Sequence, residues 1–228
     1  MNLPSKNISY TQLAVYYTNP KEWWDRYIAH IPTPKTEALL FGSISHKAFE
    51  DKRYPYRKEI YKAGLEKDKE RILDGLLLYL SPYDRPKERE KTIVVPFSDG
   101  YFLKMKCDGF DKSKEGIVLT EYKTGKALWT DERAQTSFQL LMYSYIVYEK
   151  FKKIPKIVLH SLSSQNARGK TFITKHKVSE FSLVLKAVKF YIECVEHEMM
   201  NPLYFNDEMK HIANIINYGN PRYYPKTN

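Results

Sequence analysis

Three residues within one short segment have the chemical types needed for metal-assisted hydrolysis. Asp108 precedes Glu121 and Lys123 in the segment 101–126, where two apolar-rich runs flank a polar turn at 111–116. This pattern predicts a β-hairpin, in which residues well apart in sequence can face one another. Carboxylate oxygens are the ligands that Mg²⁺ prefers, and a lysine beside a metal can orient or help to deprotonate water. The segment therefore predicts metal-assisted hydrolysis of a phosphodiester.

The elements that must position these residues predict a layered α/β domain with a mixed sheet. The expected elements are helices over 12–17, 21–29, 39–53 and 59–80, strands over 92–97, 101–110 and 117–122, a helix over 130–152, strands over 157–162 and 171–176, and a helix over 179–200. No domain boundary is visible, so we expect a single domain over 1–228. Its expected parts are an N-terminal helical part over 1–83 that could cap the sheet, an α/β catalytic core over 84–200, and a C-terminal helix with a loose tail over 201–228.

The overall composition is that of a globular chain with a basic surface. The 228 residues are 43% hydrophobic and 28% charged, with a formal net charge of +10 and a pI of about 9.3. Such an excess of Lys and Arg favours a polyanionic partner, either nucleic acid or an acidic membrane surface. The N-terminus lacks the apolar stretch of a signal peptide, and no apolar run approaches the ~20 residues of a membrane helix. We therefore expect a soluble, cytoplasmic protein.

Short motifs recur in this chain, so their order carries more information than any single match. E-x-K occurs at 50–52, 121–123 and 208–210, and Q-x-x-x-Y occurs at 12–16 and 139–143. Only the second E-x-K lies on an expected strand that follows another acidic strand. Only the second Q-x-x-x-Y follows that strand on the next helix. These two matches are therefore the ones that could belong to a site.

Four further residues are candidates for the site, and each also has an ordinary structural explanation that stays open. Gln139 and Tyr143 are four apart on an expected helix, so they share a face and could reach a phosphate or a scaffold group. A half-buried tyrosine on an ordinary helix would give the same pattern. His46 could bind a divalent metal, although a lone helical histidine is more often a surface or core residue. Glu50, one turn after His46, could add a ligand or pair with a lysine.

Taken in order, G-x-x-x-H at 42–46, Asp108, E-x-K and Q-x-x-x-Y resemble the PD-(D/E)XK nuclease superfamily. The resemblance is in particular to its RecB-type exonuclease branch, which includes CRISPR-adaptation and mitochondrial genome-maintenance exonucleases. It covers most of the chain. The further matching segments are Ile8–Leu13, Cys107–Asp111, Glu121–Gly125 and Gln139–Tyr143. The resemblance implies a restriction-endonuclease-like mixed sheet flanked by helices, with an N-terminal helical cap.

The resemblance also implies a metal site. Asp108 and Glu121 would bind one or two Mg²⁺ or Mn²⁺ ions. The backbone carbonyl of Tyr122 would complete the shell, and His46 would be a further metal ligand.

Three other residues acquire catalytic roles from the same resemblance. Lys123 would position or activate the attacking water. Gln139 and Tyr143 would orient the active site and contact the substrate strand.

One feature of the branch is missing. Many members hold an iron–sulfur cluster through one cysteine near the N-terminus and three near the C-terminus. Here Asn19-Pro20 stands at the first position, the stretch 206–220 has no cysteine, and Cys107 and Cys194 lie elsewhere. We therefore expect no iron–sulfur cluster, and packing around residues such as Trp23 must join the regions that the cluster would hold.

The first functional hypothesis is a metal-dependent DNA exonuclease that prefers single strands or DNA ends. The second is a non-catalytic nucleic-acid-binding or assembly module that retains a vestigial site. The third is a structure- or sequence-specific endonuclease, which would use the same residues. The expected partner is DNA, with a helicase, recombination or CRISPR protein as a further candidate and no membrane.

Overall fold

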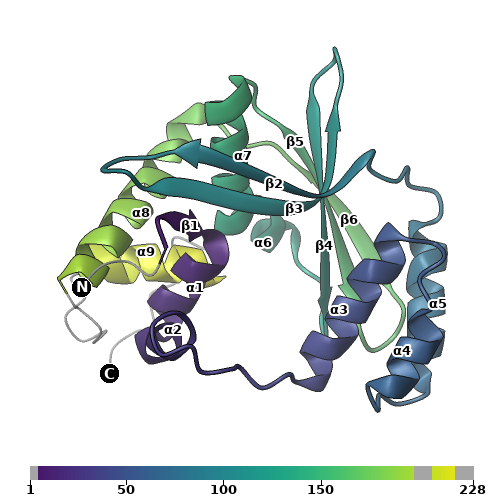
Figure 1. Ribbon diagram of the computed structural model, residues 1–228. Coiled ribbons are helices and arrows are strands. Elements are labelled where there is room, and N and C mark those ends of the chain that lie inside the picture. The colour runs from purple at the N-terminus through teal and green to yellow at the C-terminus, as the bar shows by residue number, and fades with distance from the viewer. Residues whose placement is uncertain (1–4, 198–206, 219–228) are drawn as a thin grey trace.

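The computed structural model describes residues 5–197 and 207–218, which form a twisted mixed sheet with helices on both faces (Figure 1). The strands are β1 (Asn7–Ser9), β2 (Glu88–Pro96), β3 (Phe102–Lys112), β4 (Ile117–Gly125), β5 (Lys156–Ser163) and β6 (Gly169–Thr174). The helices are α1 (Tyr10–Thr18), α2 (Pro20–Tyr27), α3 (Glu37–Glu50), α4 (Tyr56–Lys62), α5 (Asp68–Leu80), α6 (Asp131–Gln135), α7 (Phe138–Phe151), α8 (Phe181–Glu196) and α9 (Asp207–Tyr218), with a 3₁₀ turn η1 at Val178–Glu180. This is the restriction-endonuclease-like α/β fold, as expected.

Strand β3 organises the sheet. One edge of β3 pairs with β2 in antiparallel fashion along most of its length. Its other edge pairs with two strands, with β1 in parallel at its start and with β4 in antiparallel fashion at its end. Beyond β4, the sheet continues with β5 in parallel and then β6 in antiparallel fashion.

A gap opens in the sheet where β3 and β4 separate. Their last register pair is Gly109 with Thr120, so Asp108 and Glu121 would form the next pair. From there β4 continues beside β5, whereas β3 continues beside β2 (Figure 1). Strand β1 joins the same edge of β3 only at 102–104. Between these two partners, the backbone of β3 at 105–108 therefore has no strand on this edge among the described residues, although β2 pairs with its other edge.

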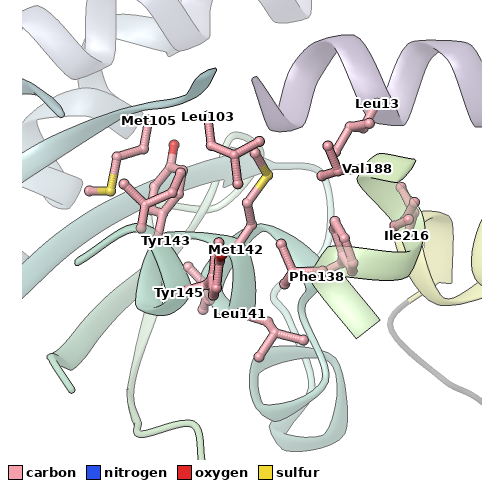
Figure 2. Close-up of a cluster of buried hydrophobic side chains, with 14 of the residues drawn as sticks. Leu13, Leu103, Met105, Phe138, Leu141, Met142, Tyr143, Tyr145, Val188 and Ile216 are labelled. Carbon is pink, nitrogen blue, oxygen red and sulfur yellow. The ribbon is translucent and has the colours of Figure 1, made fainter. Parts of the chain in front are cut away.

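The helices form two cores on opposite sides of the sheet. Helices α1, α2, α7, α8 and α9 pack with β2 and β3 in the larger core, part of which Figure 2 shows around Leu103, Met142 and Val188. Helices α3, α4 and α5 form the smaller core with Tyr122 of β4 and Leu162 of β5. The N-terminal helices thus cover the sheet in two groups, and the gap lies between them.

Side-chain packing joins the N-terminal and C-terminal helices. Trp23 is fully buried and its Nε1 donates a hydrogen bond to the hydroxyl of Tyr191 at 3.0 Å. Ile212 and Ile216 of α9 are also buried in this core, and α9 packs against α1 and α8. Trp24 remains 37% exposed and contributes less. Burial of one large aromatic residue stabilises a fold by several kcal/mol, of the order of 3–5 when it is truncated to alanine.

Local chemistry explains where the helices begin. Ser9, Asn19, Thr36 and Thr130 each accept a hydrogen bond from a first-turn N–H with their side-chain oxygen. These caps satisfy donors that have no partner inside the helix. Pro20 follows its cap at the first helical position, where the fixed φ of proline suits a helix and no N–H is needed.

Two of the expected long helices are each divided. The helix expected over 59–80 is instead α4 and α5, because Gly64 adopts φ +66° between them, a conformation that ends a helix. The helix expected over 130–152 is α6 and α7, because Ser137 has an extended ψ of 115°.

Strand boundaries differ from expectation as well. Strand β1 is not among the expected strands, and β2 begins at Glu88, four residues before the strand expected over 92–97. Strand β3 extends to Lys112, two residues beyond the strand expected over 101–110. Residues 198–200 of the expected last helix, and the expected loose tail after 218, lie outside the described residues.

None of the described helices combines the length and the apolar character that crossing a bilayer requires.

A buried histidine far from the gap gives the fold a pH dependence. His176 is 5% exposed, and burial lowers its pKa although the charge of Glu180 opposes the shift. Below the unfolded pKa of about 6.5, the unfolded chain binds a proton that the folded chain does not, so stability falls as the pH falls. Replacing His176 with Phe should reduce the change of the unfolding free energy with pH by up to about 1.4 kcal/mol per pH unit. Urea unfolding at several pH values between about 5 and 7.5 measures it, and unchanged slopes in the variant would contradict the assignment.

Candidate active site

The gap between β3 and β4 is bridged by side chains in place of the missing ladder. Asp108 Oδ2 accepts a hydrogen bond from the backbone N–H of Tyr122 at 2.7 Å. On β3, the carbonyl of Lys106 accepts a hydrogen bond from the hydroxyl of Tyr143 at 2.8 Å. Buried backbone groups need such partners, since each unsatisfied one costs about 1–3 kcal/mol. Asp108 and Tyr143 therefore have a structural role at the gap, because they supply hydrogen-bond partners to the backbones of β4 and β3.

On the α3 side, a histidine and two carboxylates converge. His46 Nδ1 lies 3.3 Å from Asp108 Oδ1. One ligand atom from each of His46, Glu50 and Asp108 lies within 4.8 Å of the others. Imidazole and carboxylate groups at this spacing could hold a divalent cation. His46 and Glu50 come together because α3 places residues four apart on one face.

On the α7 side, a second set of polar side chains surrounds the other carboxylate. Glu121 Oε1 accepts hydrogen bonds from Lys123 Nζ at 2.7 Å and from Gln139 Nε2 at 2.9 Å. Gln139 Nε2 also contacts the hydroxyl of Tyr143 at 2.8 Å. Figure 2 shows Tyr143 beneath β3 with Met105 beside it, among core side chains that hold its ring. Gln139 and Tyr143 thus connect the buried core to the carboxylate.

The second oxygen of Glu121 is available to a cation. Glu121 is 4% exposed, and Oε2 has no hydrogen-bond partner among the described residues. A buried carboxylate oxygen without a partner is costly unless a cation or another group meets it. The residues of the gap therefore fit a divalent metal ion by their donor chemistry.

Two pKa shifts follow from this arrangement. Burial raises the pKa of Glu121 to about 7; the charge of Asp108 adds to the rise and Lys123 opposes it. Burial would also raise the pKa of Asp108, but the hydrogen bond and charge of His46 and the N–H of Tyr122 outweigh it, so the pKa is lowered. The pKa values of these two carboxyl groups are therefore shifted in opposite directions. A cation bound between them would favour the ionised form of both.

The hydrogen bonds place the residues that the sequence selected in two sets. His46 contacts Asp108, and Glu121 contacts Lys123 and Gln139, which in turn contacts Tyr143. The charges of Asp108 and Glu121 interact, but Glu121 lies outside the group of His46, Glu50 and Asp108 ligand atoms. Tyr122 lies between Glu121 and Lys123, and its backbone N–H rather than its carbonyl is the group with a hydrogen bond in the site. Glu50, whose role was left open, lies in the His46 group. Its i,i+4 spacing from His46 was the available signal.

A glycine beside Asp108 keeps the two strands and the preceding connection close. A Cβ built on Gly109 would lie 2.1 Å from Pro86 Cγ and 2.9 Å from Thr120 Cβ. Gly109→Ala should therefore cost about 1–3 kcal/mol of unfolding free energy through overpacking. Gly125→Ala is the control, because its added Cβ would meet nothing closer than 3.6 Å. Chemical denaturation compares them, and equal stabilities would contradict this prediction.

Comparison with known proteins agrees with this fold. The family model of the PD-(D/E)XK nuclease superfamily matches residues 7–182. The chain belongs to this superfamily, and is thereby placed among nucleases, which hydrolyse phosphodiester bonds. A sequence comparison with curated proteins finds no match.

Two solved structures are similar to the chain. One is a proposed exonuclease from Eubacterium rectale, with a TM-score of 0.63 and 14% identity, covering 90% of this chain and 88% of that one. The other is named SSO0001, with a TM-score of 0.48 and 16% identity, covering 92% of this chain and 84% of that one. At this identity the first likeness concerns the fold.

Proposed function

We propose that the protein is a metal-dependent DNA exonuclease of the RecB-type branch that acts on single strands or DNA ends. The observation that carries the proposal is that Asp108 and Glu121 lie where β3 and β4 separate, close enough for their charges to interact. One of them has a buried oxygen without a partner among the described residues. Fold and family support hydrolysis of phosphodiesters, and the net charge of +10 favours a polyanionic substrate.

In this proposal, Asp108, Glu121, His46 and the backbone carbonyl of Tyr122 hold one or two Mg²⁺ or Mn²⁺ ions, and no iron–sulfur cluster is needed. Glu50 joins them, because its carboxylate lies within the same group of ligand atoms. A bound divalent ion supplies charge for the transition state and lowers the pKa of water.

The remaining residues orient the reacting groups. Lys123 is 28% exposed while its partner Glu121 is buried, so its ammonium can reach both the carboxylate and a water at the mouth of the gap. There it orients or helps to activate the attacking water. Gln139 fixes the Glu121 carboxylate by its hydrogen bond, and Tyr143 holds Gln139 and the β3 edge. Contacts of Gln139 and Tyr143 with the substrate strand would complete their role.

A cleavage assay tests the proposal. Linear single strands, linear duplexes with free or blocked ends, and closed circles are incubated with Mg²⁺, Mn²⁺ or EDTA. We expect products from linear single strands or free ends in either metal and none in EDTA. Nicking of closed circles into discrete products would instead indicate an endonuclease. Binding without cleavage in every metal would indicate a non-catalytic module, and faster loss of RNA than of DNA would reassign the substrate.

A further inference from the structure

A cavity of about 510 Å³ lies beside the carboxylate gap, on the α3 side of the sheet. It is lined by the end of α3, the start of α4, the end of α5, the connection from α5 to β2, and Tyr122 of β4. Aromatic side chains form much of its wall: Phe49, Tyr56, Tyr83 and Tyr122. Volumes of this size are typical of sites for small organic groups.

The cavity and the catalytic gap share parts of the chain. Tyr122 gives its backbone N–H to Asp108 and its ring to the cavity. Asp51, which lines the cavity, directly follows Glu50 of the metal-binding group. Arg85, another lining residue, donates from Nη1 to the carbonyl of Glu50 at 3.4 Å. A group that occupies the cavity would therefore be adjacent to one that reacts at the gap.

Tyr83 offers the most free aromatic surface in the wall. It is 40% exposed, whereas Phe49 and Tyr122 are 3% and 6% exposed. The Tyr83 ring is braced by contacts with His160, at 4.7 Å between ring centroids, and with Tyr79 at 5.8 Å. A ring that is held on one side and open to a cavity is suited to stack on a flat ligand.

The charges around the cavity balance. Lys52 and Arg85 are cationic, and Asp51 and Asp84 are anionic. Such a lining does not favour a phosphate, which needs a surplus of cations. It suits a neutral flat group that has donors and acceptors on its edge. A nucleobase has this chemistry, since each base has a π-face for stacking and a polar edge.

We propose that the cavity receives one unpaired nucleobase of the substrate strand, next to the phosphate at the catalytic gap, and that Tyr83 stacks on it. The inference rests on the proposed nuclease function and deepens it. A base that is stacked and paired in a duplex cannot enter such a cavity without leaving the helix. The cavity would therefore give the enzyme its preference for single strands or frayed ends.

Two variants of Tyr83 and one control test the proposal. Tyr83→Leu keeps an apolar side chain against His160 and Tyr79 but removes the ring, whereas Tyr83→Phe keeps the ring. Tyr61→Leu makes the same change at an exposed tyrosine of α4 outside the cavity. Because one stacked base contributes about 1–3 kcal/mol, Tyr83→Leu should raise KM for a single strand about tenfold. Tyr83→Phe and Tyr61→Leu should leave it unchanged.

A second measurement does not depend on cleavage. Single strands that carry 2-aminopurine at successive positions are bound in EDTA, and quenching at one position reports stacking. If Tyr83→Leu loses that quenching and the other two variants keep it, the result supports the pocket. This holds even if the wild type cleaves nothing and the nuclease proposal fails. The pocket proposal would be overturned if Tyr83→Leu showed the same quenching and the same KM as the wild type. If cleavage still depended on Asp108, the nuclease proposal would remain valid.

Discussion

Asp108→Asn should reduce Mg²⁺-dependent cleavage by at least about a thousandfold while the protein stays folded. The substitution removes the negative charge that faces Glu121 and the charged partner of His46. Loss of a metal ligand removes several kcal/mol of transition-state stabilisation, which corresponds to this factor. The asparagine carbonyl can still accept the hydrogen bond from the N–H of Tyr122, so the gap keeps its bridge. Single-turnover cleavage rates and thermal unfolding measure the two effects.

Asp111→Asn is the matched control for this experiment. Asp111 lies on the same strand, and its carboxylate accepts from the backbone N–H of Lys87 at 2.8 Å, outside the metal-binding group. We expect near wild-type cleavage from it. A wild-type rate in Asp108→Asn would refute the site. Asp108→Ala is a poorer probe, because it leaves the Tyr122 N–H without its acceptor at a cost of about 1–3 kcal/mol.

Lys123→Met should reduce the cleavage rate by about a hundred- to a thousandfold with a smaller effect on substrate binding. Its ammonium is the cation beside Glu121, and methionine replaces it with an uncharged side chain of similar length. Removing one well-placed electrostatic contact in an active site typically has an effect of this size. Rates at saturating substrate, together with unfolding curves, separate lost chemistry from lost structure.

Two further substitutions sharpen this result. Lys126→Met removes an exposed lysine three residues later and should leave the rate near that of the wild type. Lys123→Arg keeps the positive charge but cannot give up a proton. Substantial activity in Lys123→Arg would mean that Lys123 acts by charge and orientation, and activity as low as that of Lys123→Met would favour proton transfer. An active Lys123→Met enzyme would remove Lys123 from the mechanism.

The carboxylate hairpin was predictable because its signals are local. Apolar runs around the turn at 111–116 indicate two paired strands. The pairing of Gly109 with Thr120 then brings Asp108 and Glu121 to the point where the strands separate. Gln139 and Tyr143 were predictable as a pair because a helix puts residues four apart on one face. What they contact depends on how α7 packs beneath β3, which local spacing does not specify.

The features that were missed depend on contacts between distant segments. Strand β1 has three residues, too few for any alternation to be visible, and it exists because it pairs with 102–104 of β3. The separation of β3 from β4 likewise depends on distant segments, because β3 continues beside β2 and β4 continues beside β5 after the two strands part. The prediction of one helix over 59–80 was wrong for a local reason. Gly64 is a residue that commonly ends a helix, but the charged amphipathic pattern on both sides of it indicated a continuous one.

In the proposed mechanism, the burial of Glu121 also makes the activity of the protein costly to its stability. A side chain whose pKa is raised to about 7 by burial must ionise at neutral pH at the expense of folding free energy. Glutamine, its neutral isostere, would avoid that cost. The glutamine carbonyl oxygen could still accept the hydrogen bonds from Lys123 and Gln139. If Glu121 acts as proposed, selection for thermal stability alone would thus favour an inactive variant at position 121. In that proposal, the glutamate marks a position where the fold gives up stability so that the gap can hold a cation.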